Sequence, residues 1–220
     1  MRPELGSRSE DGRELSMLVW RLAAPMIAAS TAPHGGGLGP RRWVVNAQVA
    51  AGYRREDPDA HVAELAKWLG LGGPGVGMLT AVDVRAARHR DVDGARVVAS
   101  VGLGHPTWAA SPAAAPAAPT AEPSTAGVGA GTINVVALVP ERLSDAALLN
   151  ALTTVAEAKA QALLEAGVPG TGTASDASCI LCPTEGPAHA FGGPRSKWGD
   201  RLARAAHAAV RAGCGPVGAP

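Results

Sequence analysis

Residues 143–166 read LSDAALLNALTTVAEAKAQALLEA, and this stretch decides the fold. Ser144 stands where a helix N-cap belongs, and Gly167 and Pro169 follow the last apolar residues. Between these ends, Leu, Val and Ala cover nearly the whole circumference of a helix. Because a helix that is apolar on nearly all sides is normally buried, we predict a long, largely buried helix.

Shorter segments on both sides of this helix indicate further helices and several β-strands. The pattern predicts strands at 43–49, 78–80, 96–103 and 131–139, and helices at 57–69, 82–88 and 196–212. The apolar segment 17–30 contains Pro25 and is interpreted as two short strands or a hairpin arm. The elements follow no regular βαβ rhythm. We therefore predict an α+β fold, a single domain in which a mixed, mainly antiparallel β-sheet packs against the long buried helix and other helices.

Composition divides the chain into one domain and three stretches without a core pattern. We expect a flexible N-terminal tail at 1–14, the domain at 15–213 and a flexible C-terminal tail at 214–220. Within the domain, residues 109–130 consist almost only of Ala, Pro, Ser, Thr and Gly, which predicts a flexible surface insertion. A linker between two domains is the alternative interpretation of this stretch.

Charge and cysteine content limit the partners and the compartment. Twenty Lys and Arg against nineteen Asp and Glu give a net charge of +1, so no overall field attracts nucleic acid or an acidic membrane. No apolar stretch reaches the ~18 residues that span a bilayer, and residues 1–14 lack the apolar core of a signal peptide. Three cysteines suit a reducing cytoplasm better than a disulfide framework. We expect a cytoplasmic protein without nucleic-acid or membrane partners, and its oligomeric state stays open.

Four polar residues interrupt the apolar helix along one face. Asn150, Thr154, Glu157 and Gln161 follow one another at intervals of three or four residues. This stripe is either a helix edge exposed to solvent or a face that lines a site. Lys159 lies about 200° around the helix from Glu157, so the two form no local ion pair.

The loop 170–176, GTGTASD, combines three hydroxyl groups with the carboxylate of Asp176. Its glycines allow the backbone to approach a ligand closely and to present N–H groups, as an oxyanion hole or an anion nest requires. A plain turn with local hydrogen bonds is the alternative interpretation.

Other candidate residues are isolated. His34 precedes three glycines and is either an acid, a base, a ligand or a solvated side chain. Cys179 and Cys182 form a C-x-x-C motif in an apolar segment, which favours buried, unreactive thiols over a zinc site. Because carboxylates and histidines are scattered rather than spaced as ligands, we predict no metal site.

Seven short motifs, in order, resemble the adenosylcobinamide amidohydrolase family (CbiZ). They are STAPHGGG at 30–37, NAQV at 46–49, GVGMLTA at 75–81, GTIN at 131–134, AEAKA at 156–160, TGTASD at 171–176 and GGPRS at 192–196. The resemblance runs from about residue 18 to 213, apart from the insertion. It implies a hydrolase of corrinoid salvage that cleaves the amide between the aminopropanol arm of adenosylcobinamide and the corrin ring. The product is adenosylcobyric acid, which re-enters coenzyme B12 synthesis. The partner would be a corrinoid small molecule; its cobalt belongs to the substrate, so we expect no cofactor.

Within this resemblance, residue types suggest the roles that amide hydrolysis requires. Glu157 or Asp176 would activate water or a hydroxyl, Lys159 would stabilise charge, and His34 would protonate the leaving amine. A covalent route through Thr173 or Ser175 and a direct attack by water are both open. Contacts to the substrate, including the peripheral amides of the corrin, are assigned to Asn46, Gln48, Thr132, Asn134, Thr171, Ser175 and Ser196.

Two other functions compete with hydrolysis of adenosylcobinamide. One is a non-catalytic corrinoid-binding or carrier module, which also needs a cleft with amide-compatible walls. The other is an amidase that acts on an unrelated small amide. Glu157 and the hydroxyl-rich loop favour an enzyme, because binding of neutral amides rarely needs a carboxylate.

Overall fold

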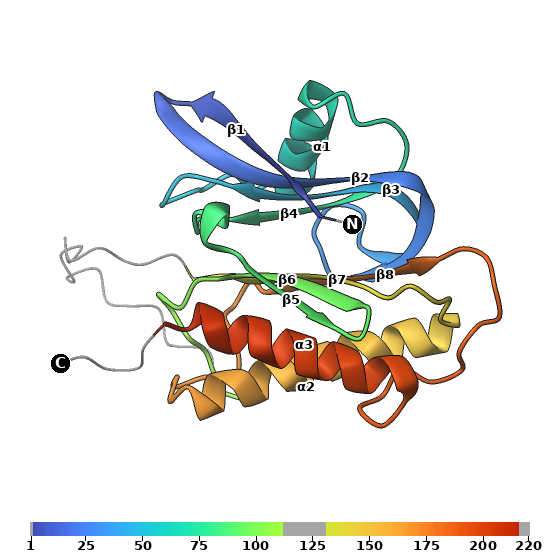
Figure 1. Ribbon diagram of the computed structural model, residues 1–220. Helices are drawn as coiled ribbons and strands as arrows, with labels where there is room; N and C mark the ends of the chain where they lie inside the picture. Colours follow the sequence, from blue (N-terminus) through green and yellow to red (C-terminus); the bar gives the residue numbers. More distant parts are fainter. Residues whose placement is uncertain (1, 112–130, 216–220) are drawn as a thin grey trace.

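The fold is built on one eight-stranded sheet that bends over so that its two halves face each other (Figure 1). A computed structural model describes residues 2–111 and 131–215 of the chain. The strand order is β4-β3-β2-β8-β7-β6-β5, with β1 paired to β2. Five of the strand pairs are antiparallel, whereas β3–β4 and β7–β8 are parallel. The predicted α+β class with a mixed, mainly antiparallel sheet is confirmed.

The N-terminal half-sheet consists of β1 (Glu4–Glu10), β2 (Arg13–Ser30), β3 (Gly37–Gln48) and β4 (Gly75–Thr80). Asp11 and Gly12 connect β1 to β2 with φ values of 51° and 73°. Positive φ at both central residues matches the twist of an antiparallel hairpin, and an Asp-Gly pair favours it. The expected flexible tail at 1–14 is therefore wrong, because most of it forms this hairpin.

The C-terminal half-sheet consists of β5 (Arg88–Val92), β6 (Ala95–Val101), β7 (Ile133–Leu138) and β8 (Ala177–Pro183). Asp93 and Gly94 form the β5–β6 turn with φ values of 47° and 90°, the same turn chemistry as in the first hairpin. The expected short helix at 82–88 is only the 3₁₀ turn Val84–Ala86, and β5 starts at its end.

Strand β2 joins the two halves. Of the two interpretations of residues 17–30, the hairpin arm is confirmed, because β2 is one 18-residue strand paired antiparallel with β1 and β3. Its register with β3 shifts between Arg21 and Met26, and Pro25 lies within the shift, where its missing N–H breaks no ladder bond. β3 pairs with β2 on both sides of the shift, whereas β1 pairs with β2 only before it and β8 only after it, from Met26 to Ser30.

Helices cover the outer faces of both halves (Figure 1). α1 (Pro58–Trp68) packs on the N-terminal half-sheet, and α2 (Asp145–Glu165) and α3 (Lys197–Gly213) pack on the C-terminal half-sheet. The predicted limits of α2 are confirmed, including its N-cap Ser144. The prediction that α2 is largely buried holds only for its inner face, because α2 lies in an outer layer and leaves Leu149 and Leu164 about half exposed.

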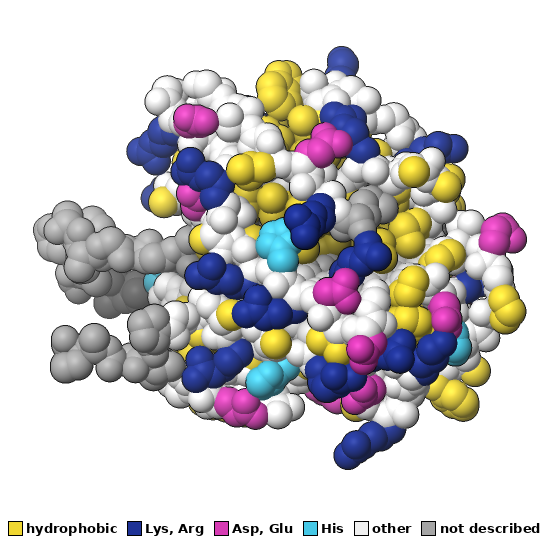
Figure 2. All heavy atoms as spheres, viewed as in Figure 1, with side chains coloured by type: hydrophobic (Ala, Val, Ile, Leu, Met, Phe, Trp, Pro, Cys, Tyr) yellow, Lys and Arg dark blue, Asp and Glu magenta, His cyan; other side chains and the backbone are white. Residues whose placement is uncertain are grey.

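Three apolar clusters fill the space between these layers. One lies between the two half-sheets and includes Met78 and Leu181; the others lie under α1 and under the α2–α3 pair. Within the described ranges, no helix is long and apolar enough to cross a membrane. Basic and acidic side chains alternate over the face that α3 covers (Figure 2). Most of the predicted insertion and of the C-terminal tail, at 112–130 and 216–220, falls outside the described residues.

Candidate active site

A cavity of about 650 Å³ lies at one end of the space between the half-sheets. Its walls come from the segments that follow β2, β3, β4 and β6 and from the segments that open β7 and β8. The parallel pairs β3–β4 and β7–β8 thus bring distant motifs of the sequence to one place. Asn134, Thr132, Ser175 and Asp176 of the predicted site residues line this cavity.

Buried amides form the inner wall of the cavity. Asn134 donates from Nδ2 to Asn46 Oδ1 at 2.9 Å and to the carbonyl of Leu79 at 3.0 Å, and Asn46 donates to Ser100 Oγ at 2.9 Å. Because the Leu79 carbonyl can only accept, it fixes which end of the Asn134 amide carries the nitrogen. The buried Oδ1 of Asn134 has no partner among the described residues. Asn46 therefore orients Asn134.

The 170–176 loop is organised around the carboxylate of Asp176. Its Oδ1 accepts hydrogen bonds from Thr173 Oγ1 at 2.5 Å and from the N–H of Ile133 at 2.8 Å. Its Oδ2 accepts one from the N–H of Thr173 at 3.0 Å and a short one from Lys159 Nζ. The Lys159 and Asp176 side chains are only 15% and 13% exposed, so solvent screens this ion pair little.

Gly172 lets this ion pair form. A Cβ atom at this position would lie 2.6 Å from Lys159 Nζ and still closer to Asp176 Oδ2. Only glycine leaves the space that the lysine needs to reach across the loop from α2. The sequence order Gly-Thr-x-x-Asp thus has a packing reason, and the 170–176 loop is more than a plain turn.

Two hydroxyl groups stand beside Asp176 on the cavity wall. Ser175 Oγ and Thr132 Oγ1 are 2.8 Å apart, and Ser175 Oγ also lies 3.4 Å from the carbonyl oxygen of Gly131. Ser175 is exposed, whereas Thr132 is 8% exposed. Ser175 therefore offers an accessible hydroxyl to a ligand in the cavity.

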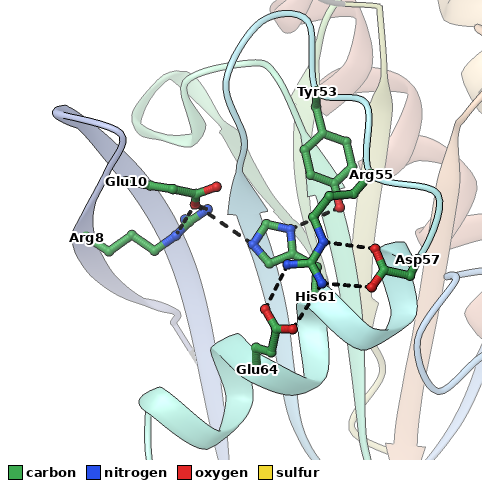
Figure 3. A network of polar contacts seen from close by, with 7 residues as sticks. All are labelled: Arg8, Glu10, Tyr53, Arg55, Asp57, His61 and Glu64. Carbon is green, nitrogen blue, oxygen red and sulfur yellow. Dashed lines mark hydrogen bonds and ion pairs between the residues drawn. The ribbon is translucent and has the colours of Figure 1, made fainter.

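Tyr53 forms part of the opposite wall and connects it to a second polar cluster (Figure 3). Its hydroxyl is 3.0 Å from His61 Nδ1 and the two rings stack, while His61 Nε2 lies 3.8 Å from Glu10 Oε2. Burial raises the pKa of Tyr53 and lowers the pKa of His61, because it disfavours the charged form of each group. The cluster, here called the α1 network, comprises Arg8, Glu10, Tyr53, Arg55, Asp57, His61 and Glu64.

Arg55 organises the outer part of the α1 network. It donates to both oxygens of Asp57 and to both oxygens of Glu64, and these hydrogen bonds hold the pKa of each carboxyl below its ordinary value. Asp57 is the N-cap residue of α1 but makes no side-chain cap, because Arg55 occupies its carboxylate. This cluster was not predicted from the sequence.

The structure does not bring Glu157 into the cavity. Glu157 and Gln161 are exposed and border a shallow groove with Arg204 and His207, on the outer side of α2. Lys159 points the other way, as the helical spacing predicted. Of the polar stripe only Thr154 is buried, where it donates to the carbonyl of Gly192. The stripe is thus mainly a solvent-exposed helix edge, and the assignment of Glu157 as a base loses its geometric support.

Gln48 and Ser196 make structural hydrogen bonds away from the cavity. Gln48 Oε1 accepts from the N–H and the hydroxyl of Ser16 in β2. Ser196 is the N-cap of α3, accepting from the N–H of Gly199 and donating to the carbonyl of Gly193. Their assignment to substrate contacts is corrected accordingly.

His34 and Thr171 also lie outside the residues that line the cavity. The Nδ1 atom of His34 is 3.1 Å from the carbonyl oxygen of Asp59, and its ring stacks on Trp43 at 5.6 Å. Thr171 Oγ1 accepts a hydrogen bond from the N–H of Ala109. Both side chains thus have structural partners, and His34 is not placed to protonate a group in the cavity.

The two cysteines of the C-x-x-C motif follow the sequence-based expectation. Cys179 and Cys182 are buried and free, and burial raises the pKa of Cys179 to about 12, which leaves its thiol unreactive. Within residues 2–111 and 131–215, no three His, Cys, Asp or Glu side chains gather as ligands for a metal ion.

Sequence reasoning missed two titratable residues that line the cavity. Tyr53 and His105 belong to irregular segments after β3 and β6, and neither is part of a motif with recognisable spacing. Only the topology of the sheet brings them to the same cavity as the 170–176 loop.

Comparison with known proteins identifies relatives of this chain. A family model described as adenosylcobinamide amidohydrolase matches residues 2–216. An adenosylcobinamide amidohydrolase of Methanosarcina mazei is 26% identical over 187 residues, which cover 81% of this chain and 85% of the relative. An adenosylcobinamide amidohydrolase of Halobacterium salinarum is 41% identical over 83 residues, 37% of this chain and 35% of the relative.

Proposed function

The chain belongs to the adenosylcobinamide amidohydrolase family, and on that premise we propose that it hydrolyses the amide between the aminopropanol arm and the corrin ring of adenosylcobinamide. The products are adenosylcobyric acid, which returns to coenzyme B12 synthesis, and the free amine of the arm. The observation that carries this proposal is the cavity itself, where a hydroxyl, a lysine-bound carboxylate and buried amides converge.

The cavity suits an amide-rimmed ligand. Asn134 offers an acceptor without a partner among the described residues, and the hydroxyls of Thr132 and Ser175 both donate and accept. Its volume of about 650 Å³ is that of a small-molecule site. We propose that it takes the amide arm and the adjoining edge of the corrin, while the rest of the ring stays outside.

In this proposal the 170–176 loop stabilises the tetrahedral intermediate of the reaction. Ala174 and Ser175 line the cavity, and we propose that their N–H groups donate to the developing oxyanion. Asp176 keeps the loop in place through its four hydrogen bonds, and Lys159 compensates its charge. Lys159 is thus a positioning residue.

The proposed reaction uses no metal or cofactor of the protein's own, since cobalt enters with the substrate. Loss of turnover on treatment with a chelator, restored by a divalent ion, would contradict this part. We also propose a cytoplasmic location, which the free state of all three cysteines supports.

The direct test is incubation of the purified protein with adenosylcobinamide, followed by mass spectrometry. We expect adenosylcobyric acid and the free aminopropanol arm to accumulate together in equal amounts. A Ser196→Ala variant, altered at the α3 cap outside the cavity, serves as the control for changes that affect stability alone.

The two competing functions predict different results in the same experiment. Intact adenosylcobinamide that binds tightly would indicate the corrinoid-binding or carrier module. Absence of corrinoid binding would leave an amidase for another small amide. Titration of the corrin absorption spectrum with protein measures binding independently of turnover.

A further inference from the structure

Three titratable side chains occur among the described residues that line the cavity: Tyr53, His105 and Asp176. Hydrolysis of an amide needs a group that takes a proton from the attacking hydroxyl and returns it to the leaving amine. The hydrogen bonds of the three side chains decide which of them is available for this role.

Asp176 and Tyr53 are already engaged. All the hydrogen bonds described for Asp176 come from donors, four in number, and one of them is the ammonium group of Lys159. Both oxygens of this carboxylate are thus occupied by donors, so Asp176 is engaged in holding the loop. The hydroxyl of Tyr53 faces His61 on the α1 side of the wall (Figure 3).

His105 has a different environment. It is exposed, and it follows β6 in a segment tied to the 170–176 loop by two backbone hydrogen bonds. The N–H of Thr107 donates to the carbonyl of Gly172 at 2.8 Å, and the N–H of Thr171 donates to the carbonyl of Thr107 at 3.0 Å. His105 is therefore held at the cavity wall by the same loop that carries Asp176.

Gly131 brings His105 and Ser175 to the same point. A Cβ atom added to Gly131 would lie 3.3 Å from the Cβ of His105, so the histidine backbone packs directly on this glycine. Ser175 Oγ lies 3.4 Å from the carbonyl oxygen of the same residue. His105 and the exposed hydroxyl of Ser175 thus flank Gly131 from two separate segments of the chain.

Ser175 is also the better of the two candidate nucleophiles. Thr173 Oγ1 donates a hydrogen bond to Asp176 Oδ1 at 2.5 Å, and Thr173 does not line the cavity. Ser175 lines it, and among the described residues its hydroxyl forms hydrogen bonds with one hydroxyl and one carbonyl group. A neutral imidazole can take the proton of such a hydroxyl as it attacks.

We propose that His105 is the proton-transfer residue of this site and that Ser175 is the nucleophile it serves. The proposal rests on the proposed function. Ser175 Oγ bonds to the amide carbon while its proton moves to His105; the C–N bond then breaks and the proton passes to the leaving amine. Water next attacks the resulting ester, gives one proton to His105, and releases the carboxylic acid as Ser175 Oγ regains that proton.

The test compares His105→Ala, His105→Gln and Ser175→Ala with the wild type and with His207→Ala, a histidine on α3 that pairs with Glu165 outside the cavity. We expect kcat to fall by about 10²–10⁴-fold in the three cavity variants, with KM changed by less than about threefold. Added imidazole should restore part of kcat in His105→Ala only, because Ser175→Ala lacks the nucleophile itself. His207→Ala should retain wild-type kcat.

Several results would overturn the proposal. A His105→Ala enzyme with kcat within about threefold of the wild type, or one that imidazole does not rescue, excludes the proton-transfer role. A Ser175→Ala enzyme that remains active excludes the nucleophile. If the wild type itself fails to cleave adenosylcobinamide, the proposed function falls as well, so the two failures are distinguishable.

Discussion

The two polar clusters that flank the cavity hold their charges in different ways. At the 170–176 loop, one carboxylate, Asp176, receives four hydrogen bonds from three residues and is 13% exposed. In the α1 network, Arg55 shares its hydrogen bonds between two carboxylates, and the side chains of Asp57 and Glu64 are 54% and 62% exposed. Both clusters contain ion pairs, but the Lys159–Asp176 pair is buried on both sides, whereas the pairs of Arg55 are open to solvent.

This difference determines what each wall contributes. A buried charge that loses a partner keeps its desolvation cost, whereas an exposed charge exchanges a partner for water. The 170–176 loop should therefore be rigid and sensitive to substitution, and the outer part of the α1 network should tolerate it. Four substitutions test this contrast, from the largest expected effect to the smallest.

Replacement of Lys159 by Met should have the largest effect. The nonpolar side chain fills the same space but leaves the buried carboxylate of Asp176 without its counter-charge, which we expect to cost about 2–4 kcal/mol in the free energy of unfolding. Urea unfolding measures this change. The matched control is Lys197→Met, which breaks the exposed pair of Lys197 with Glu141. Equal losses in the two variants would contradict the contrast between buried and exposed pairs.

Replacement of Gly172 by Ala should separate Lys159 from Asp176 without removing either charge. The added Cβ overlaps both partners, and we expect a loss of about 1–3 kcal/mol together with a fall in kcat. Gly72→Ala is the control, since a Cβ at that glycine meets no atom within 4 Å. Thermal unfolding and turnover of both variants check the prediction. A Gly172→Ala variant with the stability and kcat of the wild type would show that the loop adapts to the added Cβ.

Replacement of His61 by Gln should have a smaller effect that depends on pH. At neutral pH the lost bond to Tyr53 costs about 1 kcal/mol. Burial lowers the pKa of His61 in the folded protein, so below pH 6.5, its ordinary pKa, the unfolded chain binds the proton more readily. The stability of the wild type should thus fall as the pH drops below 6.5, and His61→Gln should reduce this dependence.

The midpoints of urea unfolding between pH 7.5 and 5 measure how the stability changes with pH. In His61→Gln this dependence should be weaker than in the wild type but should not vanish completely. Burial also lowers the pKa of His89, which therefore contributes in the same direction and remains in the variant. A His61→Gln variant with the full wild-type slope would mean that His61 titrates equally in the folded and the unfolded chain.

Replacement of Arg55 by Gln should have the smallest effect. Its pairs with Asp57 and Glu64 are open to solvent, so we expect the melting temperature and kcat to stay within experimental error. Differential scanning fluorimetry at low and high salt measures the melting temperature of this variant and of the wild type. A loss comparable to that of Lys159→Met would place the whole α1 network among the rigid parts of the cavity wall.

Elements whose ends and side-chain spacing are both marked by nearby residues could be predicted from the sequence. The ends of α2 follow from Ser144 and Gly167, and its side-chain directions correctly separated Lys159 from Glu157. The burial of α2 was overestimated, because alanine is found on the exposed face of an outer helix as well as on its buried face. The hairpin turn at Asp11 was overlooked, although an Asp-Gly pair between polar residues is a turn signal.

The candidate site could be predicted only where its residues are neighbours in sequence. Asp176 and Ser175 belong to one short motif, which the structure places on the cavity wall. His105 and Tyr53 reach the same cavity because β6 and β3 end there, which no local pattern reveals. Gln48 shows the reverse case, since a polar residue at the end of a strand can serve the neighbouring strand instead of a ligand.

The continuity of β2 has a consequence for the order of folding during synthesis. Its Met26–Ser30 edge pairs with β8, and Ser30 donates a hydrogen bond to a carbonyl 148 residues further along the chain. The first four strands can associate early, but this edge remains unpaired until β8 has left the ribosome. Such late, non-local pairing slows folding and leaves a template for strand addition from another nascent chain. Completion of β8 therefore removes this template by covering the Met26–Ser30 edge.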